Sequence, residues 1–174
     1  MTRRNVGLVP QDPFLFSRSI RDNVALALEG DGNGRVEDAV RMAALERDLA
    51  TFPHGLDTLV GERGVTLSGG QKQRVALARV LAAAPRVIVL DDSLSMVDAQ
   101  TERLILDRLR EFIHERTTII VAHRITTVRE ADLICVVDDG RVVEVGDHDT
   151  LVARGGLYAD LFRQQALEGE LEAI

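Results

Sequence analysis

Hydrophobic residues in this chain follow two different spacings, which predict strands separated by helices. Short apolar runs rich in β-branched residues predict three strands. The first begins at Val6 and ends in a polar loop at Gln11, the second is Val87–Leu90, and the third runs from Thr117 to His123. Because helical segments separate these strands, and polar residues follow the strand ends, we predict an α/β fold with a mainly parallel sheet.

Three stretches show the spacing of an amphipathic or buried helix. The first contains Val36, Val40, Ala43 and Ala44, the second runs from Val75 to Ala84 and is stopped by Pro85, and the third is marked by Leu104, Ile105, Leu109, Phe112 and Ile113. Near the C-terminus, Asp139-Gly140 lies between two apolar runs, 132–138 and 141–145, and predicts a β-hairpin.

One short polar stretch directly precedes the second predicted helix. Two glycines there allow the backbone to approach a phosphate closely, and a serine hydroxyl beside them can donate to it. The stretch consists of Leu67, Ser68, Gly69, Gly70 and Gln71. A helix N-terminus has unpaired amides and a positive dipole end, so this position favours an anion.

Two carboxylates follow the apolar strand Val87–Leu90. Asp91 and Asp92 stand at its C-terminal end, and Asp91 comes twenty residues after Gln71. A buried strand that ends in a carboxylate is typical of phosphate-transfer sites that hold Mg²⁺.

Together, LSGGQ and the strand ending in Asp91 resemble the signature motif and Walker B segment of ATP-binding cassette (ABC) ATPases. The resemblance covers essentially the whole chain and implies a partial P-loop NTPase (RecA-like) core with a helical signature subdomain. It implies a Q-loop strand and loop at 1–14, the helical subdomain at 15–84 and the remaining core at 85–174. ATP and Mg²⁺ are the implied cofactors.

The resemblance also assigns roles to single residues. Asp91 would hold Mg²⁺, Gln11 of the Q-loop would touch Mg²⁺ or the attacking water, and Asp92 stands at the position of the general base. His123 matches the H-loop histidine at the γ-phosphate. Asp98 is the last residue of the segment 95–98, which resembles the D-loop. The resemblance implies that Asp98 binds nucleotide together with the signature. Glu62 matches the acidic residue of the exporter X-loop.

The segment around Phe14 and Phe16 resembles the exporter region next to the coupling helices of the transmembrane subunit. These two rings are therefore either a docking surface or part of the core. No apolar run approaches the ~20 residues of a membrane span. We expect a cytoplasmic location at the inner face of the membrane, through a transmembrane partner domain.

Composition narrows the remaining possibilities. A net charge of −7 argues against a general nucleic-acid surface. The single cysteine, Cys135, excludes an intramolecular disulfide and is predicted to be a small core residue. His148, between Asp147 and Asp149, could suggest a metal ligand, but one imidazole beside exposed carboxylates is predicted to be solvated.

The sequence departs from the family in two places. It contains no G-x-x-x-x-G-K-[ST] motif, and its one lysine, Lys72, lies in the signature helix. The family's preceding strands and P-loop helix are also missing, so we expect an exposed apolar sheet surface and a chain that aggregates when alone. Asp92 replaces the usual glutamate, as in the degenerate half of heterodimeric exporters, and its shorter side chain would reach the attacking water poorly.

The predicted function is that of an ATP-binding and ATP-hydrolysing segment of an ABC exporter of drugs, lipids or peptides. Its partners would be a second nucleotide-binding domain, whose ATP site the Leu67–Gln71 signature completes, and a transmembrane domain. The alternative is a catalytically inert fragment or interaction module that cannot bind ATP alone without a P-loop. A third interpretation, a soluble ABC ATPase of repair or translation, fits the exporter-like segment around Phe14 less well.

Overall fold

The computed structural model describes residues 5–28, 33–61 and 65–172. The chain divides into two compact units, Met1–Val121 and Ala122–Ile174. Glu62, the X-loop residue of the sequence analysis, lies outside the described residues.

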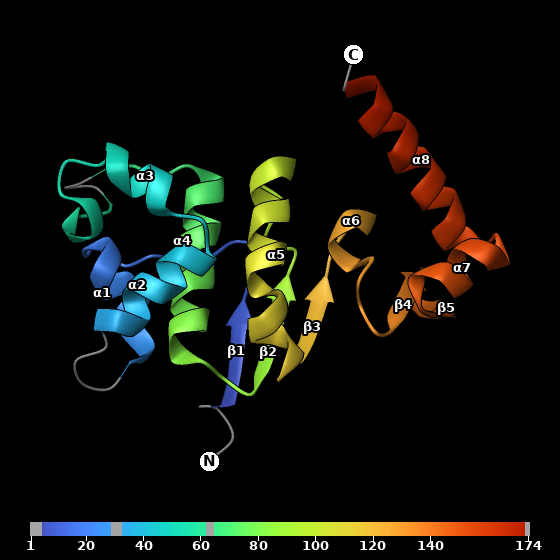
Figure 1. Cartoon of the computed structure of the whole chain (residues 1–174), viewed down its shortest axis with the longest axis horizontal. Coiled ribbons are helices and arrows are strands. Elements are labelled where there is room, and N and C mark those ends of the chain that lie inside the picture. The colour runs from blue at the N-terminus through green and yellow to red at the C-terminus, as the bar shows by residue number, and fades with distance from the viewer. Residues whose placement is uncertain (1–4, 29–32, 62–64, 173–174) are drawn as a thin grey trace. The chain divides into compact units, whose positions relative to one another are not determined.

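A three-stranded parallel sheet forms the centre of the first unit (Figure 1). The strands are β1 (Val6–Val9), β2 (Val87–Asp91) and β3 (Thr117–Val121), in the order β1-β2-β3. Both pairs are parallel, with Val9 opposite Leu90 and Leu90 opposite Ile120. The predicted α/β fold with a parallel sheet is confirmed, and the carboxyl ends of all three strands lie at the same edge.

The helix that begins within the LSGGQ stretch packs on this sheet. This helix, α4 (Gly69–Ala83), has a nearly continuous set of buried residues that includes Leu77 and Leu81. It lies so close to β1 that a Cβ added at Gly7 would be 2.5 Å from Cγ1 of Val80. It ends at Ala84, whose φ of 47° is left-handed and turns the chain into Pro85 and β2.

Short helical segments surround α4 (Figure 1), and α1, α2 and η2 contact it. They are α1 (Ile20–Val24), α2 (Asn33–Met42) and α3 (Glu46–Thr51), with 3₁₀ turns η2 (Ala25–Ala27) and η3 (Gly55–Asp57). The apolar residues that predicted the first helix are buried, as expected: Val36, Val40, Ala43 and Ala44.

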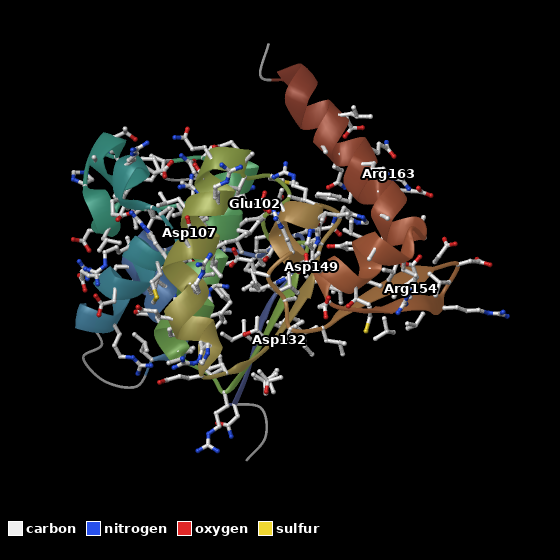
Figure 2. All side chains as sticks on the ribbon, turned by 45° about the vertical axis from the view of Figure 1, so that its right-hand side comes forward. Glu102, Asp107, Asp132, Asp149, Arg154 and Arg163 are labelled. Atoms are coloured by element: carbon white, nitrogen blue, oxygen red, sulfur yellow. The ribbon has the colours of Figure 1, made fainter. Side chains whose placement is uncertain are left out.

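Helix α5 (Ala99–His114) follows β2 and presents one apolar face to the core. Ile105 and Leu109 are buried, as predicted, whereas Leu104 is 38% exposed and does not belong to that face. Figure 2 labels Glu102 and Asp107 on this helix; Glu102 is buried with the apolar face and Asp107 is exposed. The wrong prediction for Leu104 arises because adjacent residues on a helix point about 100° apart, so only one of Leu104 and Ile105 can face inward.

One face of the parallel sheet carries exposed apolar side chains. Leu8 is 55% exposed and Ile119 is 51% exposed, whereas their neighbours Val9 and Ile88 are buried on the other face. Parallel sheets normally have both faces covered. The expected exposure of apolar sheet surface is therefore observed.

The second unit is built on an antiparallel hairpin. Strands β4 (Ile134–Asp138) and β5 (Arg141–Gly146) pair through the predicted turn, where Asp139 and Gly140 both have positive φ. The helices are α6 (Ile125–Val128), α7 (His148–Arg154) and α8 (Leu157–Glu172), and a small core joins Ile125, Ile134, Leu151 and Tyr158. Arg154 on α7 and Arg163 on α8 are labelled in Figure 2. No helix in the described parts of the chain is long and apolar enough to cross a membrane.

Two predictions for this unit are wrong. Cys135 is exposed, because β4 alternates and only Ile134 and Val136 face the small core. His148 is partly buried rather than solvated: its Nδ1 lies 2.9 Å from the Tyr158 hydroxyl, and its ring packs edge-on against Phe162. Among the described residues, no cluster of three or more His, Cys, Asp or Glu side chains could hold a metal.

Candidate functional site

The carboxyl ends of β1 and β2 bring three predicted site residues to one edge of the sheet. Asp91 ends β2 with its side chain exposed. Gln11, in the loop after β1, donates from Nε2 to Oδ2 of Asp92 over 3.2 Å. The backbone amide of Asp92 donates to the Val121 carbonyl over 2.8 Å, which ties this corner to β3. The structure therefore brings Gln11 and Asp92 together, and their roles toward Mg²⁺ and the attacking water stay predictions.

Asp92 has an unusual backbone. Its φ of 45° lies in the left-handed region, which asparagine and aspartate tolerate better than longer side chains. This turn directs the chain away from the strand immediately after Asp91. The observed geometry fits aspartate at this position.

The donor set at this edge suits Mg²⁺. Because Gln11 uses its amide nitrogen toward Asp92, its amide oxygen is left for another partner. The exposed Asp91 carboxylate belongs to the residue directly before Asp92. Mg²⁺ in phosphate sites is held by one or two carboxylates together with phosphate oxygens and water, so a larger acidic cluster is not required. Asp91 and Gln11 are the residues that would hold the ion.

A second cluster forms the N-terminus of α4. Ser68 is the N-cap: its Oγ accepts from the Gln71 amide over 3.2 Å, and the Gln71 Oε1 accepts from the Ser68 amide over 2.9 Å. This reciprocal pair is a capping box. The amides of Gly69 and Gly70 have no acceptor within the helix, so they and the dipole favour an anion here. Leu67, immediately before the cap, is buried.

A nearly buried ion pair supports this cap from behind. Arg74 Nη1 lies 2.6 Å from Oδ2 of Asp48, and Gln71 Nε2 donates to Oδ1 of the same carboxylate over 2.8 Å. Burial raises the pKa of Asp48, but hydrogen bonds from Arg74 and Gln71 outweigh it and hold the pKa below its ordinary value. Asp48 on α3 therefore fixes the side chain that completes the capping box.

The two signature glycines have a packing role as well. A Cβ added at Gly70 would lie 2.6 Å from the backbone oxygen of Met96, and one added at Gly69 would overlap the Met96 sulfur. Gly70 therefore allows the loop 93–98 to lie against the start of α4, and Gly69 leaves room for the Met96 side chain. This packing role is separate from the close approach to a phosphate that the sequence predicts for these glycines.

Asp98 caps the next helix. Its Oδ1 accepts from the Thr101 amide over 2.9 Å at the start of α5. That hydrogen bond is the main reason that the pKa of Asp98 lies below its ordinary value. The nucleotide-binding role of Asp98 stays a prediction, and the capping role is observed.

His123 belongs to the second unit. Its backbone oxygen accepts from Gln165 Nε2 over 2.8 Å, and Gln165 Oε1 accepts from the Ile125 amide over 2.8 Å. A glutamine of α8 thus anchors the segment that carries His123. The role of the imidazole stays a prediction.

Several residues of the site were missed from the sequence. Asp48, Arg74 and Met96 gave no pattern, since their contacts join segments far apart in the chain. Gln73 gave one: it precedes Ala76, Leu77 and Val80 at helical spacing and is a polar residue on an apolar face. Its side chain is fully buried.

Comparisons with known proteins agree with this geometry. Residues 1–95 match the model of the ABC transporter family, so the chain belongs to that family. It is 44% identical over 171 residues to the multidrug resistance protein pgp-1 of Caenorhabditis elegans, and 46% identical over 162 residues to YheI, a probable multidrug resistance ABC transporter ATP-binding/permease protein of Bacillus subtilis.

A solved structure is also similar. A bacterial Atm1-family ABC exporter with ATP bound superposes with a TM-score of 0.88 at 44% identity and covers 94% of this chain. The chain spans 29% of that exporter chain, and 13% and 28% of the lengths of the two relatives. Members of this family are ATPases that bind nucleotide. In its exporters, nucleotide-binding domains are paired with transmembrane domains. The fold of this chain is that of an ABC ATPase fragment.

Proposed function

We propose that this chain is the nucleotide-binding segment of an ABC exporter, coupling ATP binding and hydrolysis to transport of drugs, lipids or peptides. The observation that carries the proposal is the capped N-terminus of α4, where the Gly69 and Gly70 amides have no acceptor within the helix. The similar proteins support the exporter class, since two of them are named as multidrug resistance proteins and one is an exporter with ATP bound.

The segment contributes to two ATP sites. At its own strand ends, Asp91 and Gln11 hold Mg²⁺ and Asp92 acts on the attacking water. His123, in the second unit, is assigned to the γ-phosphate by its match to the H-loop histidine. At the start of α4, residues Leu67–Gln71 bind the ATP held by a second nucleotide-binding domain, with Asp98 beside them. The capping box leaves the Ser68 hydroxyl hydrogen available to donate to a phosphate, because the oxygen accepts from Gln71.

The surface around Phe14 and Phe16 docks the transmembrane partner. These rings are 70% and 40% exposed, and their centroids lie 5.1 Å apart in an edge-on arrangement, which supports a docking surface over a place in the core. The Arg79 guanidinium lies 5.9 Å from the Phe16 ring and donates to the Phe14 carbonyl, so the exposed rings are held in place. This docking places the chain at the cytoplasmic face of the membrane.

A second candidate function has one specific observation in its favour. No G-x-x-x-x-G-K-[ST] motif occurs in the sequence, so no lysine of the chain is placed to bind the β- and γ-phosphates. On this alternative the chain is an inert interaction module that presents its signature and docking surfaces only.

Thermal unfolding of the purified chain with and without Mg²⁺-ATP, at several protein concentrations, separates the two. A ligand that binds the native state raises the midpoint by mass action. We expect the rise in the midpoint to grow with protein concentration. The strand ends of one copy and the signature of another bind the same ATP molecule, so binding requires two copies. Asp91→Asn should reduce the part of the rise that needs Mg²⁺. An unchanged midpoint at every concentration would favour the interaction module.

A further inference from the structure

One buried amide contacts both parts of the site. Gln73 is fully buried, in the first turns of α4. Its Nε2 donates to the Gln11 backbone oxygen over 3.2 Å and to Ser95 Oγ over 3.3 Å, and lies 3.5 Å from the Asp92 backbone oxygen. Its Oε1 accepts from the Met96 amide over 3.0 Å. A buried amide with both ends bonded is rigid, because each lost partner leaves a costly unpaired group.

These partners belong to different segments of the chain. Gln11 follows β1, Asp92 follows β2, and Ser95 and Met96 lie in the loop before α5. These segments also contact one another directly: Gln11 Nε2 donates to Asp92 Oδ2, and both the amide and the Oγ of Ser95 donate to the Asp92 backbone oxygen. The Gln73 side chain adds hydrogen bonds to all three segments.

The loop held by Gln73 is the one that packs on the signature. The Met96 backbone oxygen occupies the space that a Cβ at Gly70 would need, and the Met96 sulfur occupies that at Gly69. The hydrogen bond from the Met96 amide to Gln73 therefore helps to hold this loop at its distance from Gly69 and Gly70, at the start of α4.

We propose that Gln73 is a positioning residue that couples the Gln11–Asp92 corner to the Gly69–Gly70 phosphate cradle of the same chain. The proposal rests on the proposed function, in which the first group serves this chain's own ATP and the second serves the partner's. A displacement of Gln11 or Asp92 changes the hydrogen bonds of the Gln73 amide, and Met96 transmits the change to the glycines. A change at one ATP site then alters the geometry of the other site through the Gln73 side chain.

Two substitutions separate positioning from packing. Gln73→Met keeps the size of the side chain but removes its donor and its acceptor, whereas Gln73→Glu keeps the acceptor for Met96 and, when protonated by burial, one donor. If Gln73 only fills space, the apolar methionine is tolerated and the glutamate is not. If Gln73 positions the loop, the order is reversed.

Residue-resolved amide exchange of the full chain without nucleotide gives the readout. In Gln73→Met we expect the Met96 amide to exchange about tenfold faster while Lys72, inside the cap, is unchanged; in Gln73→Glu we expect Met96 to stay protected. Gln100→Glu, at an exposed position of α5, is the matched control. Unchanged Met96 exchange in Gln73→Met, or equal acceleration throughout α4, overturns the proposal. Should Gln73→Met not fold, loss of Met96 protection in Gln73→Glu overturns it and retention supports it.

The coupling itself is tested by Asp92→Asn. We expect this change to shift the amide resonances of Met96 and Gly70 when residue 73 is glutamine, and to leave them in place when it is methionine. Equal shifts in both backgrounds overturn the coupling. This experiment contains no nucleotide, so equal shifts in both backgrounds would count against the coupling alone. The absence of a thermal shift with Mg²⁺-ATP would count against the proposed function alone.

Discussion

Single residues at this site combine a local structural role with a chemical one. Ser68 caps a helix and presents a hydroxyl, and Asp98 caps the next helix. Gly70 has an amide with no acceptor within the helix and also leaves room for the Met96 backbone. Substitutions at such positions change stability and binding together, so stability must be measured first.

The contacts of the glycines predict different costs for two similar changes. A Cβ at Gly70 meets backbone, whereas one at Gly69 meets the end of the flexible Met96 side chain. We expect Gly70→Ala to lower the free energy of unfolding by about 1–3 kcal/mol, as overpacking does, and Gly69→Ala to cost less. Urea denaturation of both variants measures this. Adding Met96→Ala should restore Gly69→Ala but not Gly70→Ala, and restoration of both would show that the backbone contact is unimportant.

Ser93 carries a cost that can be removed. It is buried directly after Asp92, and its Oγ has no hydrogen-bond partner among the described residues. We expect Ser93→Ala to raise the free energy of unfolding by about 1 kcal/mol, because a buried unpaired hydroxyl is eliminated. Chemical denaturation tests this, with Ser95→Ala as the control that loses hydrogen bonds to Gln73 and Asp92. A less stable Ser93→Ala would indicate a partner for the hydroxyl.

At this scale the family resemblance named Gln11 and Asp92 as members of one site, and their chemical roles stay predictions. The structure brings the two side chains into contact, because both residues follow strands of one parallel sheet. The role of Asp48 was not predictable, since a lone aspartate in a helix gives no sign that Arg74 and Gln71 will reach it. Gln73 could have been found as the polar member of an apolar helical face.

Among the elements, α3 and α4 are joined by the Arg74–Asp48 pair, whose side chains are only 12% and 16% exposed. We expect Asp48→Asn to lower the free energy of unfolding by about 2 kcal/mol at neutral pH, as for hydrogen bonds to charged groups. Asp38→Asn is the control, because its pair with Arg41 is exposed and contributes little.

The pKa of Asp48 fixes the pH range of this effect. Since the folded-state pKa lies below the ordinary value of 3.8, the stabilisation is fully present above that value and is lost as the pH falls through the folded pKa. The difference between the native chain and Asp48→Asn should therefore persist from neutral pH to about 4 and shrink below it. Denaturant midpoints at pH 7, 5 and 3 measure the trend. A difference that grows on acidification would contradict the assignment.

The parallel sheet exposes apolar side chains on one face, and this has a consequence for solubility. Ile119 is 51% exposed on β3, whereas its neighbour Ile120 packs against the core. We expect Ile119→Lys to reduce association of the chain in sedimentation, with a stability change within about 0.5 kcal/mol. Ile120→Lys should destabilise the fold instead. Unchanged association in Ile119→Lys would mean that this face is not the adhesive surface.

Hydrophobic spacing predicted the existence and order of most elements but not how each is covered. Val87–Leu90 is a strand as expected, although only Ile88 and Leu90 are buried in it. Cys135 was placed in the core because its neighbours are apolar, but the alternation of β4 turns it outward. A strand sequence does not state how many of its faces will be packed, because that depends on distant elements.

For the molecule as a whole, the decisive feature is aspartate at position 92. Its left-handed backbone suits aspartate, and its carboxylate already accepts from Gln11, so the side chain is held near the strand end. In the proposed exporter it would position an attacking water less well than the longer glutamate, because small errors of placement are costly in catalysis. The site would then bind ATP and hydrolyse it slowly.

Asp92→Glu tests this in an assembled transporter that supplies the P-loop and the partner domain. We expect ATP turnover to rise by roughly 10–100-fold, because a misplacement of about 1 Å in a catalytic group can lower the rate by up to about 100-fold. Asp92→Gln has the length of glutamate without its charge, so it should not raise turnover, which separates reach from basicity. Equal turnover in Asp92→Glu and the native protein would contradict the view that side-chain length limits this site. In that case the glutamate would be prevented from reaching the water by the backbone turn, whose left-handed φ a longer side chain adopts at greater cost.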